Sequence, residues 1–126
     1  MALKEPADPL ERNKVKLSDE AIVSMVTDRS TKVKANEVLK PTGKFGTFEA
    51  TLKEFKAKRE HSINYIKTTT DDLRNHYNDF PFGKADAYQT MLVMTAHSKR
   101  HTDQIEEIMK HVNFPKKEDR DYGKVS

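Results

Sequence analysis

Apolar residues recur at helical spacing in two long stretches of the chain. In the first, steps of three or four residues link the apolar positions over about five turns, apart from one gap that Arg59 fills. The second stretch runs from about Asp86 to Val112. Both patterns predict an amphipathic helix with one apolar stripe. The stripe of the first helix consists of Phe48, Leu52, Phe55, Ile63 and Ile66.

Polar residues predict where these helices begin. Ser18 precedes two acidic residues and a short apolar group, which predicts a capped helix that ends near Arg29. Thr47 can cap the first long helix. Asp86, with Gln89 three residues later, resembles a capping box for the second long helix.

The remaining segments predict turns and loops. Asn113 is a candidate left-handed cap at the end of the last helix, and Pro115 prevents that helix from continuing. The segment "DDLRNHY" predicts a short turn, and "NDFPFGK" predicts a rigid loop. Since no run alternates with period two for long enough to predict a strand, the expected class is all-α.

The composition suits one small domain that lacks a full hydrophobic core. Of 126 residues, 35% are hydrophobic and 34% charged, and none is cysteine, which excludes disulfides and thiolate catalysis. We expect residues 1–17 to be a polar extended segment, 18–115 a helical domain and 116–126 a mobile polar tail. The formal charge of +3 comes from interleaved acids and bases and does not predict nucleic-acid binding. Because the chain has no long apolar run, we expect no membrane contact and a cytoplasmic location.

Two histidines four residues apart are the strongest chemical signal. At about 100° per residue, His97 and His101 fall on the apolar stripe of the last helix with Met94 and Ile105. Side chains at this spacing are neighbours, with Cβ atoms roughly 5–6 Å apart, so two imidazoles can converge on one metal ion. The alternative is that each imidazole bonds to a carbonyl or carboxylate group. No glutamate follows the first histidine, so this is not the H-E-x-x-H pattern of metalloproteases.

Three further residues are candidates for contacting a substrate or supporting a metal ligand. Arg59 lies on an apolar stripe, where it either extends to solvent or lines a charged cleft. His76 lies in an irregular segment before "FPFG". Gln104 lies beside the histidine pair and could orient an imidazole by hydrogen bonding. His61 and Arg100 are expected on the surface.

Three stretches together resemble the DinB-like superfamily of metal-binding four-helix bundles. They are "TDRSTKVKANEVLKPTGKF", the segment from "TLKEFKAKRE" to "KADAYQ", and "AHSKRHTDQIEEI". The resemblance covers nearly the whole chain up to Pro115. It implies four helices and a divalent metal, commonly nickel or zinc, held by three histidines. His97 and His101 are the counterparts of the two ligands from the fourth helix.

The chain also departs from the family pattern. The chain begins at what looks like the end of the second helix, so the third histidine has no counterpart. We therefore expect a partial up-down bundle with exposed apolar stripes. Three explanations are open: the reading frame is truncated, a homodimer completes the bundle, or the chain is an inactive remnant. Family members include thiol S-transferases that use low-molecular-weight thiols. The sequence leaves two functions open: a metal-dependent transferase or hydrolase, and a non-catalytic helical dimerisation or binding module with structural histidines.

Overall fold

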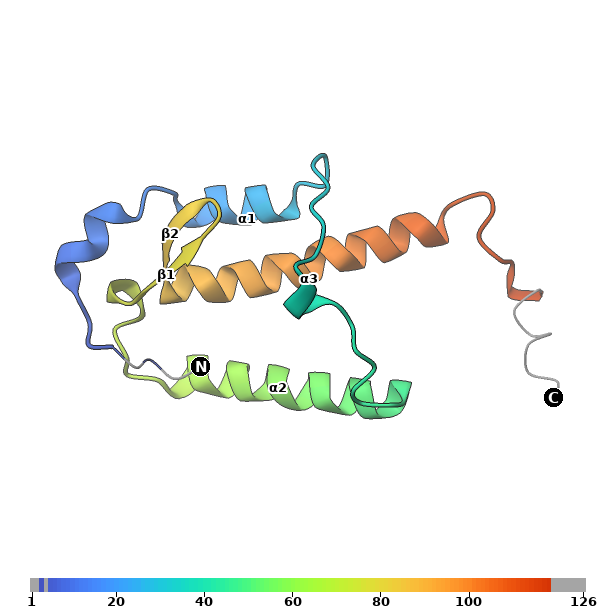
Figure 1. Ribbon diagram of the computed structural model, residues 1–126, viewed down its shortest axis with the longest axis horizontal. Helices are drawn as coiled ribbons and strands as arrows, with labels where there is room; N and C mark the ends of the chain where they lie inside the picture. The colour runs from blue at the N-terminus through green and yellow to red at the C-terminus, as the bar shows by residue number, and fades with distance from the viewer. Residues whose placement is uncertain (1–2, 4, 119–126) are drawn as a thin grey trace. The chain divides into compact units, whose positions relative to one another are not determined.

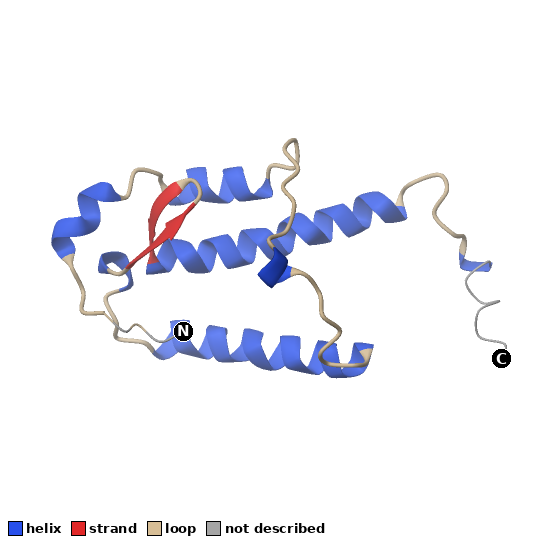
Figure 2. Cartoon of the chain, in the orientation of Figure 1, coloured by secondary structure: helices blue, strands red, loops and turns tan. Residues whose placement is uncertain are grey.

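The protein is mostly helical, which confirms the predicted all-α class (Figures 1 and 2). The computed structural model describes residue 3 and residues 5–118. Most of the predicted tail, residues 119–126, therefore lies outside the described residues. The helices are α1 (Asp19–Thr27), α2 (Phe48–Thr68) and α3 (Ala87–Met109), with short 3₁₀ helices η1 (Pro9–Lys14), η2 (Glu37–Leu39) and η3 (Leu73–Asn75) and strands β1 (Tyr77–Phe80) and β2 (Gly83–Asp86).

The chain divides into two compact units. One contains residues 1–16 and 31–88, and the other contains residues 17–30 and 89–126. We describe each unit by its own contacts. Within the described residues, no helix has the length and apolar content needed to cross a membrane.

Side-chain caps start α1 and α2 at the predicted residues. Ser18 Oγ accepts a hydrogen bond from the Ala21 amide at 3.1 Å, and Thr47 Oγ1 accepts one from the Ala50 amide at 3.1 Å. Each cap satisfies one of the amide groups that have no partner in the first turn of a helix. The predicted starts of both helices are therefore confirmed.

A β-hairpin in the first unit corrects the prediction of a loop at "NDFPFGK". Strands β1 and β2 pair antiparallel, with Tyr77 opposite Asp86 and Phe80 opposite Gly83. Gly83 has φ +119°, a conformation that side chains disfavour, and it follows the two-residue turn. Each strand has only four residues, which is too short for an alternating pattern to stand out. The N-terminal segment was also predicted to be extended, but Pro9–Lys14 forms η1, because proline is favoured in the first turn of a helix.

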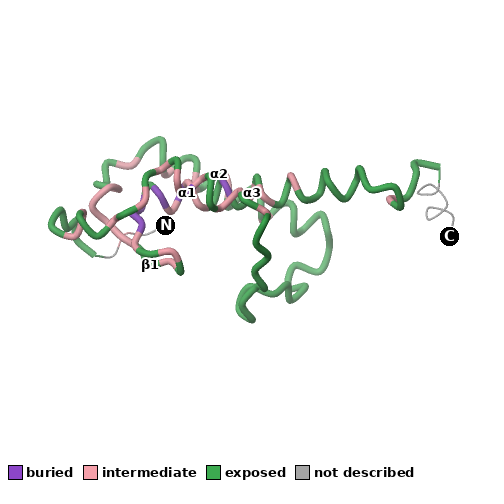
Figure 3. The backbone as a smooth tube through the Cα atoms, turned by 90° about the horizontal axis from the view of Figure 1, so that it is seen from above, coloured by how far each residue is buried: buried purple, intermediate pink, exposed green. Residues whose placement is uncertain are grey.

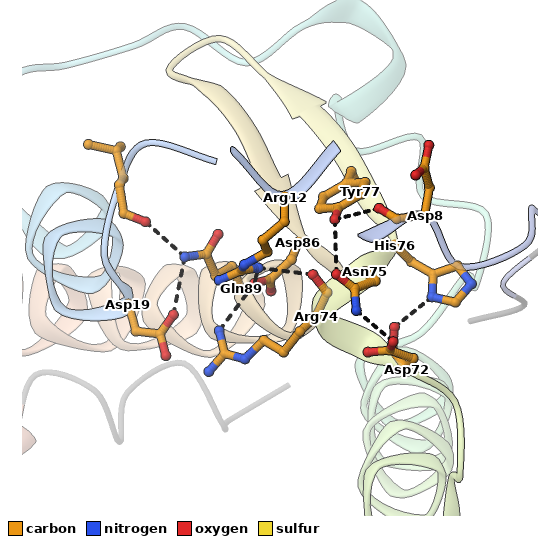
Figure 4. Close-up of polar contacts among 11 residues, drawn as sticks. Asp8, Arg12, Asp19, Asp72, Arg74, Asn75, His76, Tyr77, Asp86 and Gln89 are labelled. Atoms are coloured by element: carbon orange, nitrogen blue, oxygen red, sulfur yellow. Dashed lines mark hydrogen bonds and ion pairs between the residues drawn. The ribbon is translucent and has the colours of Figure 1, made fainter. Parts of the chain in front are cut away.

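A buried carboxylate joins three parts of the first unit (Figure 4). The side chain of Asp86 is fully buried at the end of β2. Its Oδ2 accepts hydrogen bonds from Arg12 Nη1 of η1 and from Arg74 Nη1 of η3, the latter at 3.2 Å. Arg12 Nη1 also donates to the Arg74 carbonyl at 2.9 Å, and the Arg74 guanidinium lies 4.0 Å from the centre of the Tyr88 ring. The capping-box pattern did not predict these partners of Asp86.

In the second unit, α1 and α3 lie side by side and run in the same direction (Figure 1). Near their starts, buried Gln89 donates from Nε2 to the Leu17 carbonyl at 2.9 Å and to Asp19 Oδ1 at 3.1 Å (Figure 4). Beyond the end of α1, Arg100 Nη1 donates to the Asp28 carbonyl. The buried apolar side chains of this unit are Ile22, Met91 and Ala96.

The end of α3 differs from the prediction. The helix ends at Met109 rather than Val112, and no described non-glycine residue, Asn113 included, has positive φ. The Lys110 amide is shared between the Glu106 and Glu107 carbonyls, at 3.1 and 3.2 Å. This tightened last turn satisfies the carbonyl groups without a left-handed residue.

The apolar stripes of both long helices are exposed, as the sequence predicted. Figure 3 shows the second half of α3 coloured as exposed along most of its length. On α2, the exposed fractions range from 37% for Leu52 to 75% for Phe48. On α3, Met94 is 41% exposed and Ile105 is 58% exposed. Exposed apolar surface of this extent is typical of a face that contacts another molecule.

Replacing Asp86 with asparagine should destabilise the first unit. The substitution removes the charge that Arg12 and Arg74 both contact, so we expect the free energy of unfolding to fall by about 1.5–3 kcal/mol. Urea unfolding followed by circular dichroism measures this change. The control is Asp79→Asn, because the Asp79 side chain is 85% exposed and pairs with Lys84 at 3.1 Å; its effect should stay under about 0.5 kcal/mol. Equal effects of the two substitutions would contradict the stabilising role of the buried carboxylate.

Replacing Tyr65 with phenylalanine should raise the pKa of Asp71. The Tyr65 hydroxyl donates to Asp71 Oδ2 at 2.7 Å just beyond the end of α2, and this bond holds the pKa of Asp71 below its usual value. The bond therefore stabilises the fold above the usual aspartate pKa of about 3.9, and this contribution is lost as the pH falls through the folded value. Carboxyl ¹³C NMR titration should show the rise in Tyr65→Phe but not in Tyr77→Phe. An unchanged Asp71 titration in Tyr65→Phe would refute this assignment.

Candidate metal centre

The side chains of His97 and His101 converge on one side of α3. Their Nε2 atoms are 3.0 Å apart, and their ring centres are 4.5 Å apart with an angle of 84° between the planes. The helix produces this arrangement, because residues four apart lie one above the other on the same face. Both side chains are exposed, so the space around the two nitrogens is open to solvent.

The spacing of the two nitrogens fits a shared divalent ion. Histidine nitrogens bind zinc at about 2.0–2.1 Å, so two of them on one ion lie roughly 3 Å apart when the angle between the bonds is about 90–110°. The observed 3.0 Å lies at this separation. A separation of 3.0 Å is also the length of an ordinary N–H···N hydrogen bond. The two nitrogens can therefore share a proton when no ion is bound and bind an ion when that proton leaves.

Gln104 determines which nitrogen of His101 carries a proton. Gln104 Oε1 lies 3.2 Å from His101 Nδ1. Because an amide oxygen only accepts, His101 must donate from Nδ1, and its Nε2 then carries the lone pair. His97 Nε2–H donates to that lone pair. Gln104 therefore aims an unprotonated His101 nitrogen at His97, which is the state that a metal ligand requires.

The environment of His97 disfavours its charged form. Partial burial lowers the pKa of His97 below its usual value, and the nearby His101 and Arg100 lower it further. Metal ions bind the neutral imidazole, so a lowered pKa extends the range of metal binding to lower pH.

Two other candidates, Arg59 and His76, belong to the first unit. The Arg59 guanidinium lies 5.3 Å from the centre of the Phe55 ring, so the arginine covers part of the exposed stripe of α2. His76 Nδ1 lies 2.7 Å from the Asp72 carbonyl oxygen, and its Nε2 lies 2.9 Å from the Glu5 carbonyl oxygen (Figure 4 shows the first of these). Gln104, the third supporting candidate, belongs to the second unit and contacts the histidine pair through His101.

The comparisons with known proteins place the chain in a family. The family model of the DinB superfamily matches residues 7–105. The chain belongs to the DinB superfamily. No significant match was found among curated proteins or among solved structures. Within the described part of this DinB-superfamily chain, no group of three or more histidine, cysteine, aspartate or glutamate residues is arranged to hold a metal ion.

The sequence did not predict the contacts that Arg29 and Arg100 make within the second unit. Arg100 was expected on the surface, but it is half-buried, and its Nη1 donates to the Val26 carbonyl at 3.4 Å as well as to Asp28. Arg29 Nη1 lies 2.5 Å from Glu107 Oε2. The carbonyl groups at the end of α1 attract cations, which is the physical signal for Arg100. No pattern within α3 indicated the pairing of Glu107 with Arg29.

Replacing Gln104 with leucine should change the tautomer of His101. We expect His101 to carry its proton on Nδ1 in the wild type and to shift toward the Nε2–H tautomer in Gln104→Leu, because the acceptor is lost. Two-dimensional ¹H–¹⁵N NMR of the imidazole nitrogens measures the tautomer. The control is Asp103→Asn, since Asp103 is on the same helix and pairs with Lys99 at 2.7 Å. If the tautomer is the same in wild type and Gln104→Leu, Gln104 does not orient His101.

Proposed function

We propose that this chain binds a divalent metal ion, nickel or zinc, through His97 and His101. The observation that carries this proposal is the 3.0 Å separation of their Nε2 atoms on an exposed face of α3. Imidazole suits both ions. Two observations support it: the bond to Gln104 leaves the lone pair of His101 on Nε2, and the lowered pKa of His97 favours its neutral ring.

The chemistry we propose is that of metal-dependent thiol S-transferases and hydrolases. A bound divalent ion lowers the pKa of a coordinated water or thiol and so supplies a nucleophile at neutral pH. In this chain, His97 and His101 hold the ion, and Gln104 fixes the ring of His101. The proposed substrate class is a low-molecular-weight thiol.

We also propose that the site is completed in a homodimer. His97 and His101 supply two ligands, while zinc sites use three protein ligands or four. A second copy with its α3 facing this one would bring another histidine pair. The exposed apolar side chains beside the pair, such as Met94 and Ile105, support this contact because a second helix would cover them.

A second candidate function is a non-catalytic helical dimerisation module. The observation that favours it is the length of the exposed stripes, which extend along both α2 and α3. In this function the His97–His101 contact is a structural N–H···N hydrogen bond, and no metal is needed. The two candidates differ in metal content and agree on association.

Replacing His97 or His101 with alanine should abolish stoichiometric binding of zinc and nickel. Losing a ligand should weaken binding by more than the roughly 10–100-fold that loss of an outer-shell partner costs. Isothermal titration calorimetry of metal-free protein measures the affinity. The matched control is His61→Ala, which removes an exposed histidine from α2 and should leave the affinity unchanged. Wild-type protein that binds neither ion, or equal loss in all three variants, would overturn the metal proposal.

The ratio of metal to chain separates the two candidates. Elemental analysis of gel-filtered protein, combined with light scattering for mass, should give one metal ion per two chains in a dimer. A dimer that excludes metal after incubation with nickel or zinc would support the dimerisation module instead. A monomer that holds one ion per chain would contradict the shared site but keep metal binding.

A further inference from the structure

A cleft of about 380 Å³ lies next to the histidine pair within the second unit. Its volume falls in the range of small-molecule sites, which is roughly 300–1,000 Å³. Gln104 connects the two features, because it lines the cleft while its Oε1 contacts His101 Nδ1 at 3.2 Å. The other lining residues are Arg29, Glu107, Ile108, His111, Asn113, Phe114 and Pro115.

One wall of the cleft is fixed by contacts at the end of α1. Arg100 Nη1 donates to the Asp28 carbonyl, and the Asp28 side chain accepts a hydrogen bond from the Ser30 amide at 2.9 Å. These bonds hold the backbone on both sides of Arg29. The guanidinium of Arg29 has five N–H donors, and its Nη1 pairs with Glu107 Oε2.

Another part of the cleft is built where the chain turns after α3. The Asn113 amide donates to His111 Nδ1 at 3.2 Å, and the Phe114 amide donates to the His111 carbonyl at 2.9 Å. This turn brings Phe114 and Pro115 to the same cleft as Ile108. The cleft therefore has apolar surface from these three residues and one strong cation, Arg29.

We propose that this cleft binds a small organic monoanion, namely a carboxylate with an apolar or aromatic body. The carboxylate pairs with Arg29, and the body lies against Ile108, Phe114 and Pro115. Glu107 selects the charge, because its carboxylate already neutralises part of Arg29 and repels a dianion such as sulfate. The link between this ligand and the metal centre, through Gln104, rests on the proposed function. The binding of the ligand in the cleft does not depend on that function.

Benzoate is the probe, and the measurement is a titration of full-length metal-free protein followed by ¹H–¹⁵N NMR. Millimolar benzoate should shift the side-chain amides of Gln104 and Asn113 and the backbone amides of Ile108 and Phe114. Benzyl alcohol, which keeps the ring without the charge, should bind more weakly. Sulfate, which is a dianion at neutral pH, should leave these signals in place. Shifts spread over the exposed stripe of α2, or equal binding of benzoate and benzyl alcohol, would overturn the proposal.

Two variants should change benzoate affinity in opposite directions. Arg29→Gln should weaken binding by roughly five- to tenfold, because it removes the charged donor. Glu107→Gln should strengthen it severalfold, because it removes a competing carboxylate. The matched control is Lys99→Gln, which removes a cation from the same unit that pairs with Asp103 at 2.7 Å and does not line the cleft; it should have no effect. If both cleft variants weaken binding equally, a general loss of structure explains the result and the proposed charge recognition is wrong.

The link to the metal centre is tested in the same titration. Benzoate should still bind His97→Ala with unchanged affinity, and zinc affinity of the wild type should change when the cleft is saturated with benzoate. Benzoate binding in a protein that takes up no zinc would leave the cleft assignment standing and refute the proposed metal function. Zinc binding without any benzoate response would leave the metal function standing and refute the cleft assignment.

Discussion

The buried carboxylate of Asp86 is the constraint on which the first unit depends. A carboxylate removed from water is stable only when charges and hydrogen bonds replace its hydration. Arg12 and Arg74 provide both, and they come from η1 and η3, which place them 74 and 12 residues from Asp86 along the chain. Few side chains in this unit are buried and apolar, among them Ala85 and Ala87. A polar network, rather than a large apolar core, therefore specifies how these short elements meet.

Local interactions were predictable from the sequence, and contacts between distant segments were not. The start of α1 at Ser18 and that of α2 at Thr47 follow from side chains that bond only three residues away. The convergence of His97 and His101 likewise follows from helical spacing alone. By contrast, the spacing of Asp86 and Gln89 suggested a capping box within one helix. The structure also gives both residues partners more than 60 residues away. The hairpin was missed because its strands are four residues long and are fixed mainly by pairing with each other.

The candidate site is built almost entirely on one rigid element. Gln104 and the two histidines lie within two turns of α3, so their relative positions hardly depend on the rest of the chain. The cleft differs in this respect. It needs Arg29, which follows α1, and Phe114, which follows α3, and both positions depend on hydrogen bonds outside the helices. The sequence could therefore predict the histidine pair but not the cleft beside it.

The parallel course of α1 and α3 has an electrostatic consequence. The macrodipoles of antiparallel neighbours cancel, whereas those of parallel helices add, with both positive ends together. Asp19 and Glu20 lie in the first turn of α1, where negative charge offsets this accumulation. At the opposite end of α1, Arg100 places positive charge on the carbonyl oxygens of Val26 and Asp28. The charged residues at the two ends of α1 thus act as counterions that allow two helices to lie in an orientation their own fields oppose.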